Sequence, residues 1–159
     1  MDRRPRGNRA LRIVGGGAAV IAGSFLVLFV PVIVYAVGLA VGARGVPDQR
    51  AINTFAATLS PALMPWAERA LTAGVTIWAV RRDPGARPVD GFFTGLVAGV
   101  LGVGVTLAFG AVLAIGSAVN VVILAALGWL GGVVGQRIRA DHSSKHTVIP
   151  GRSTSTRPR

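Results

Sequence analysis

The sequence contains no cysteine, and both charged and aromatic side chains are scarce. The lack of cysteine excludes disulfides, thiolate metal sites and cysteine nucleophiles. Charged residues make up 14% of the 159 residues, against about 25% in an average soluble domain. Hydrophobic residues reach 52%, there are 22 glycines, and the mean hydropathy is +0.59. This composition predicts an integral membrane protein and argues against both an ordinary soluble fold and a disordered chain.

Acidic residues are also few: six, against 17 lysines and arginines, for a formal net charge of +11. Fourteen of the basic residues fall within the segments 1–12, 81–90 and 137–159. In a soluble protein this excess of basic residues would indicate nucleic-acid binding. Here no aromatic residues interleave with the arginines, so we expect no nucleic-acid partner. We expect the basic segments to meet anionic lipid headgroups of the bilayer instead.

Two long runs carry no charge, residues 13–43 and 91–135. A crossing needs about 20 apolar residues. Because the glycines at 15–17 suit a helix interior poorly, we predict the first span near 18–41, with a kink at Pro31. The apolar run exceeds the roughly 7–15 residues of a signal-peptide core, which favours a retained anchor over a cleaved one. The second run is long enough for two spans, predicted near 91–112 and 117–136, with a turn at 115–117.

A further span is predicted near 61–81, after a loop and a helical turn or short interfacial helix over 44–60. Ser60 followed by Pro61 is a typical helix start, with serine as the cap and proline in the first turn. Glu68 and Arg69 interrupt the apolar character of this span. Trp66 and Trp78 suit the two membrane interfaces.

Four spans place both termini and the 81–90 loop on one side of the membrane. Fourteen basic residues then lie on that side, while the opposite side has Arg44 and Arg50. Cytoplasmic segments are enriched in lysine and arginine. The prediction is therefore an all-α, four-helix transmembrane bundle in the plasma membrane, with both termini cytoplasmic. It comprises a basic N-terminal segment (1–12), the membrane domain (13–136) and a disordered basic tail (137–159).

The second span carries a polar stripe, because Glu68, Arg69, Thr72 and Thr76 share one arc at helical spacing. Ionisable residues within a membrane usually face the bundle interior or water. One interpretation is a polar path or substrate site, with Glu68 as a carrier of a proton or cation. The alternative is a structural pair near the outer interface whose side chains reach the headgroups.

Small residues recur at four-residue spacing and predict close helix packing. The packing glycines are Gly91, Gly95, Gly99, Gly102, Gly128, Gly131, Gly132 and Gly135, and Gly38 and Gly42 repeat the spacing in the first span. These faces pack either within one chain or against a second copy or a larger membrane complex. Asn120 is expected in the turn or in a hydrogen bond between helices.

No catalytic motif is present. The sequence lacks a phosphate-binding glycine-rich loop that ends in lysine and serine or threonine, and it lacks HExxH and GxSxG. His142 and His146 are four residues apart but have no third metal ligand. We therefore predict no enzyme activity, catalytic residue, metal or cofactor. The expected function is an accessory, scaffold or assembly role through glycine-rich helix packing, and the alternative is a small oligomeric channel or transporter that uses the polar stripe.

Overall fold

The computed structural model describes residues 7–43, 45–83, 85–108, 110 and 115–146. Within these ranges 93% of residues are helical and there are no strands. Four helices follow one another: α1 (Gly7–Ala43), α2 (Gln49–Arg82), α3 (Pro88–Ala108) and α4 (Ile115–His146). The all-α prediction is confirmed. Residues 1–6 of the predicted N-terminal segment and residues 147–159 of the predicted tail lie outside the described residues.

The first helix is longer than predicted because it runs straight through the glycines at 15–17. Gly16 and Gly17 allow α1 to approach α3 closely, whereas Gly15 has open space where a Cβ would stand. A Cβ atom on Gly17 would come within 3.1 Å of the Ala98 backbone nitrogen, and one on Gly16 within 2.9 Å of Thr94 Cγ2. Packing against α3 therefore compensates for the low helix propensity of glycine. Pro31 lies inside α1, as expected.

The second helix begins earlier than predicted. Asp48 caps it by accepting a 2.8 Å hydrogen bond from the Arg50 backbone nitrogen. Ser60 and Pro61 therefore lie inside a continuous helix, and their interpretation as a helix start is wrong. Pairing with α1 supports this first part of α2, since the rings of Tyr35 and Phe55 stack with centroids 4.2 Å apart.

The turn between α3 and α4 also lies elsewhere than predicted. Gly110 adopts a φ of +77° just after α3, a conformation that glycine reaches without a steric penalty. Ile115, Gly116, Ser117 and Asn120 all belong to α4, so the expected turn at 115–117 is wrong. Helix α4 continues to His146, and the disordered tail predicted from residue 137 therefore does not begin there.

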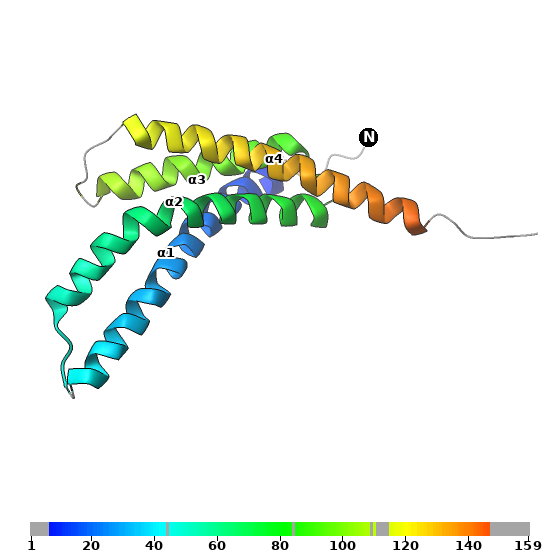
Figure 1. Cartoon of the computed structure of the whole chain (residues 1–159). Helices are drawn as coiled ribbons and strands as arrows, with labels where there is room; N and C mark the ends of the chain where they lie inside the picture. The colour runs from blue at the N-terminus through cyan, green and yellow to red at the C-terminus, as the bar shows by residue number, and fades with distance from the viewer. Residues whose placement is uncertain (1–6, 44, 84, 109, 111–114, 147–159) are drawn as a thin grey trace, which may run out of the picture.

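The helices form a bundle in which α1 and α4 each pack against α2 and α3. The most extensive contact joins α3 and α4, while α1 and α4 do not adjoin within the described ranges. Figure 1 shows α3 and α4 side by side, with the N-terminal half of α1 and the C-terminal half of α2 completing the bundle. In this arrangement α1 and α3 run in the same direction, and α2 and α4 run in the opposite one.

Part of α1 and α2 extends beyond this bundle as a helical pair, which we call the arm. Ile21 lies beside Gly102, and at that register the end of α3 at Ala108 falls beside α1 near Leu28. Asn120 bonds to Glu68, so α4 begins beside α2 near Leu63. The arm therefore comprises residues 29–43 and 49–62. It diverges from the direction of α3 and α4 in Figure 1.

Among the residues that the structure describes, three helices are long and apolar enough to cross a membrane: α1 from Arg9, α3 as a whole, and α4 up to Asp141. Helix α2 is not among these three helices. Its N-terminal part is rich in polar residues, and Glu68 and Arg69 interrupt the apolar remainder. The structure thus supports a membrane protein.

Candidate functional site

Glu68 is partly buried on the face that α2 turns toward α3 and α4. Its Oε2 accepts a 2.8 Å hydrogen bond from Asn120 Nδ2 on α4. Its Oε1 lies 3.6 Å from where a Cβ atom on Gly102 of α3 would stand. The carboxyl group therefore sits where three helices meet. Asn120 makes the interhelical hydrogen bond that was one of its two predicted roles.

Arg69 points away from its neighbour in sequence. Its guanidinium carbon lies 5.4 Å from the centroid of the Trp66 ring, a cation–π arrangement. Within the described ranges Glu68 and Arg69 form no ion pair, because adjacent helical residues point about 100° apart. The predicted stripe therefore divides into two: Glu68 faces inward and Arg69 packs on a tryptophan.

Two polar atoms near Glu68, Thr72 Oγ1 and Asn120 Oδ1, are buried without a hydrogen-bond partner among the described residues; so is Arg69 Nε, whose side chain points away from Glu68. Thr72 is completely buried. A buried polar atom without a partner is costly, especially within lipid. Thr72 lies one helical turn from Glu68 on α2 and Asn120 is its hydrogen-bond partner, so the region suits a small polar guest such as water.

Thr76 continues the same face of α2 one turn further along. Its hydroxyl donates to the backbone oxygens of Thr72 at 2.8 Å and Ala73 at 3.0 Å. Beyond it lies a cavity of about 30 Å³, lined by Thr76, Thr94 and Asp90 among others, which is room for about one water molecule. Thr72, Thr76, Thr94 and Asp90 are all buried. Together with Glu68 they form a file of polar residues through the bundle, which we call the polar line.

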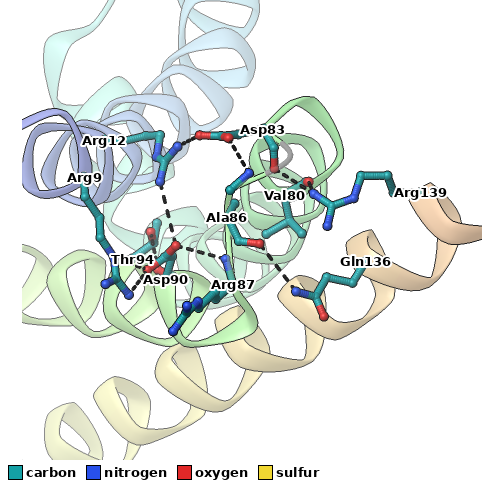
Figure 2. A network of polar contacts seen from close by, with 11 residues as sticks. Arg9, Arg12, Val80, Asp83, Ala86, Arg87, Asp90, Thr94, Gln136 and Arg139 are labelled. Atoms are coloured by element: carbon teal, nitrogen blue, oxygen red, sulfur yellow. Dashed lines mark hydrogen bonds and ion pairs between the residues drawn. The ribbon is translucent and has the colours of Figure 1, made fainter. Parts of the chain in front are cut away.

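The polar line ends at Asp90, which organises a polar network at one end of the bundle (Figure 2). Asp90 Oδ1 accepts a 2.7 Å hydrogen bond from Arg9 Nε and lies 2.5 Å from Arg9 Nη2. Asp90 Oδ2 accepts a 3.0 Å bond from the Arg87 backbone nitrogen and lies 3.8 Å from Arg12 Nη2. Because Asp90 sits in the first turn of α3, it caps that helix and pairs with α1 at once.

The short loop between α2 and α3 is held from both sides at this end. Arg12 forms an ion pair with Asp83, which in turn accepts a bond from the Gly85 backbone nitrogen at 2.7 Å. From α4, Arg139 donates to the carbonyl oxygens of Val80 at 3.2 Å and Asp83 at 2.7 Å, and so caps the C-terminus of α2. We call this end of the molecule, where α1, the loop and α4 meet, the network end (Figure 2).

The glycines of α3 and α4 face one another across their contact. A Cβ atom on Gly91 would overlap the Gly128 carbonyl oxygen, and one on Gly95 would overlap that of Leu124. A Cβ on Gly99 would come within 2.9 Å of Val121 Cα, and one on Gly132 within 2.8 Å of Pro88 Cα. The backbones therefore approach as closely as only glycine permits.

The other predicted packing glycines behave differently from one another. Gly131 and Gly135 lie against α2, where a Cβ atom would meet Thr76 Oγ1 and, at 2.9 Å, the Ile77 carbonyl oxygen. Gly102 is less crowded. Gly38 and Gly42, on the arm, have open space where a Cβ would stand. Apart from the less crowded Gly102, the predicted packing glycines of α3 and α4 thus lie against neighbouring helices of the same chain.

Sequence reasoning did not single out the network residues. The charge pattern indicates Arg9, Arg12 and Arg139 only as topology signals, and it does not indicate Asp90. One signal was available: Pro88 followed by Asp90 is a typical first turn, since an acidic residue there reaches back to the cap nitrogen. The pairing partners were not predictable, because they lie more than 50 positions away in the sequence.

Within the described ranges no three residues of His, Cys, Asp or Glu are grouped to hold a metal ion. No protein-family model matches the chain, and comparison with curated proteins and with solved structures gives no match either.

Proposed function

We propose that the chain crosses the plasma membrane four times, with both termini and the network end in the cytoplasm. The parallel direction of α1 and α3 supports a crossing by α2 as well. If α1 and α3 both cross the membrane in the same direction, α2, which connects them, must cross back through the same bilayer thickness. Its polar residues there are partnered in part by other helices, as with Glu68 and Asn120. The network end gathers the basic segments of α1, the α2–α3 loop and α4, which fits the enrichment of arginine on the cytoplasmic side. Reporter fusions at Ala51 and Gly85 test this topology and should report opposite sides.

Within this topology we propose that the protein is a small channel or transporter that carries protons along the polar line. The observation that carries the proposal is Glu68, an acidic side chain held among three helices beside buried polar atoms that lack partners. Intramembrane carboxyl groups commonly mark proton pathways. Glu68 lies beside Gly102 of α3. Gly102 is about 21 Å of helix rise from Pro88 at the network end, so Glu68 lies deep in the roughly 30 Å core.

The size of the interior favours a proton over a larger solute. The cavity between Thr76, Thr94 and Asp90 is about 30 Å³, enough for about one water molecule. The glycine contacts of α4 with α2 and α3 close the bundle around the polar line. A proton needs only hydrogen-bonding groups and single waters, whereas a larger solute needs an open passage. Glu68 would bind the proton, and the polar line would lead it toward the network end.

The test is proton flux into liposomes that contain the purified chain, under an imposed potential. Glu68→Gln should abolish the flux while the helical content and the size of the detergent complex stay the same. Thr58→Ala, on the exposed face of the arm, is the matched control and should leave it unchanged. Equal flux in Glu68→Gln, or no flux from the wild-type chain, would overturn the proposal.

A second candidate is an accessory or assembly role without transport. It is favoured by the rigid, glycine-closed bundle, which ends in a surface of exposed arginines at the network end: Arg81, Arg82, Arg87 and Arg137. Such a surface fits an acidic protein segment or anionic headgroups. Recovery of one reproducible partner after mild detergent extraction supports this role if that recovery falls when these arginines are replaced by glutamine.

A further inference from the structure

The arm has two unlike outward faces. Along α1 it exposes large apolar side chains, each at least half exposed: Phe29, Val30, Ile33, Val34, Val37 and Val41. Along α2 the exposed positions are mostly small or polar and include Arg50, Asn53, Thr54 and Thr58. The two helices join through their inner sides, where Tyr35 stacks on Phe55. The arm is therefore an amphipathic helical pair with an apolar side on α1 and a polar side on α2.

The bundle already accounts for the thickness of a membrane without the arm. Helix α3 has 21 residues, which corresponds to about 31 Å and matches a hydrocarbon core of about 30 Å. The arm begins where α3 ends, at the end of the bundle opposite the network end. If the arm continued straight, its apolar face would be exposed to water. Protein surfaces in water rarely expose a large continuous apolar face.

Prolines mark the place where the arm departs from the bundle. Pro31 in α1 and Pro61 and Pro65 in α2 are the prolines inside the described helices, apart from Pro88 in the first turn of α3. The pairing of Tyr35 with Phe55 and of Gly23 with Leu71 sets Pro31 at about the level of Pro61. Each proline removes one backbone hydrogen bond and favours a bend. In Figure 1 the arm turns aside here, with α1 on the side facing back toward the network end and α2 on the other.

We infer that the arm lies in the headgroup region of the outer leaflet, with its α1 face on the acyl chains and its α2 face toward water. The apolar face of the arm is continuous with the exposed side of α1 within the bundle, where Leu26 and Val27 are also exposed. Lipid that surrounds the bundle therefore reaches the arm without a break. An amphipathic element with these two faces binds a bilayer surface in this orientation.

The inference rests on the proposed membrane crossing, and single-cysteine variants test the two separately because the chain has no cysteine of its own. A bimane fluorophore is attached at Val34→Cys or Val37→Cys on the α1 face, or at Thr54→Cys on the α2 face. Val100→Cys, more than half exposed near the middle of α3, is the reference for bilayer depth. Each labelled protein is reconstituted in phosphatidylcholine and phosphatidylglycerol vesicles with lipids that carry a nitroxide quencher at a shallow or a deep acyl position.

At Val34 and Val37 we expect at least twofold stronger quenching by the shallow quencher than by the deep one, and the reverse at Val100. The label at Thr54 should respond chiefly to iodide in the outer solution. Deep quenching at Val34 would show that the arm spans the bilayer, and iodide quenching there would show that it stands in water. Either result overturns the inference.

Protection of Val34 from all three quenchers, lost on dilution into excess lipid, would instead show that a second copy covers the face and would also overturn it. Iodide quenching at Val100 would reject the membrane crossing itself, apart from the arm. Circular dichroism of each variant confirms that the helices are retained.

Discussion

The side-chain amide of Asn120 on α4 donates a 2.8 Å hydrogen bond to the carboxyl group of Glu68 on α2. This bond joins parallel helices that are not consecutive in the chain. Interhelical hydrogen bonds within membranes contribute about 0.6 kcal/mol on average, and up to about 1–2 kcal/mol. The bond therefore positions Glu68 more than it stabilises the bundle.

Asn120→Ala should lower the free energy of unfolding in detergent by about 1 kcal/mol, because it removes the bond and leaves Glu68 without that partner. The measurement is denaturation followed by circular dichroism, combined with Glu68→Ala in a double-mutant cycle. The second replacement should then cost less in the Asn120→Ala background than in the wild type. Strictly additive effects would show that the two side chains are not coupled.

Gly95→Ala should destabilise the bundle by about 1–3 kcal/mol, the usual cost of overpacking. Its Cβ would overlap the Leu124 carbonyl oxygen, so α3 and α4 would have to move apart. Gly104→Ala is the control on the same helix, since open space surrounds its Cβ position. There alanine should be neutral or stabilise the helix by up to about 1 kcal/mol. Equal effects at the two sites, in thermal unfolding, would contradict the glycine-mediated contact.

Asp90→Asn should loosen the start of α1 at the network end, where Arg12 keeps its ion pair with Asp83. The substitution removes the charge that pairs with Arg9 and Arg12, and hydrogen bonds to charged groups contribute about 1.5–3 kcal/mol. Because Arg9 is half exposed and water weakens its ion pair, we expect a loss of stability at the lower end of this range. Hydrogen exchange should quicken over residues 9–20 and in the α2–α3 loop. Asp48→Asn, which retains a good helix cap, should leave exchange at the network end unchanged, and an identical response there would refute the pairing role.

Replacing both Pro61 and Pro65 by alanine should straighten α2 and move the arm relative to the bundle. Alanine restores the backbone hydrogen bonds that proline removes. Spin labels at Val41→Cys, on the arm, and Val119→Cys, near the start of α4, report the change as a shifted distance distribution in pulsed electron resonance. An unchanged distribution would mean that helix packing alone sets the direction of the arm.

The fold class and the approximate positions of the helices follow from the sequence, because apolar runs and charged breaks are local signals. The helix ends do not. Glycine at 15–17 and proline at 61 argue locally against a helix interior, yet α1 and α2 pass through them. Contacts with other helices outweigh these local preferences, and no pattern within the segments reveals which contacts will form.

The candidate site was predictable in part. Helical spacing places Glu68, Thr72 and Thr76 on one face, and the structure turns that face inward. Spacing also places Arg69 on the same arc, but its long side chain instead packs on Trp66. Asp90 and its arginine partners were missed, because which charges pair depends on how the ends of α1, α3 and α4 come together. The four-span topology and the proton path remain predictions.

The most direct test of the account is the side of the membrane on which the α2–α3 loop lies. In a chain without cysteine, Gly85→Cys and Thr54→Cys are treated in intact cells with a membrane-impermeant maleimide. With the network end in the cytoplasm, Thr54→Cys should be labelled in intact cells and Gly85→Cys only after the membrane is permeabilised. Labelling of Gly85→Cys in intact cells would contradict this topology.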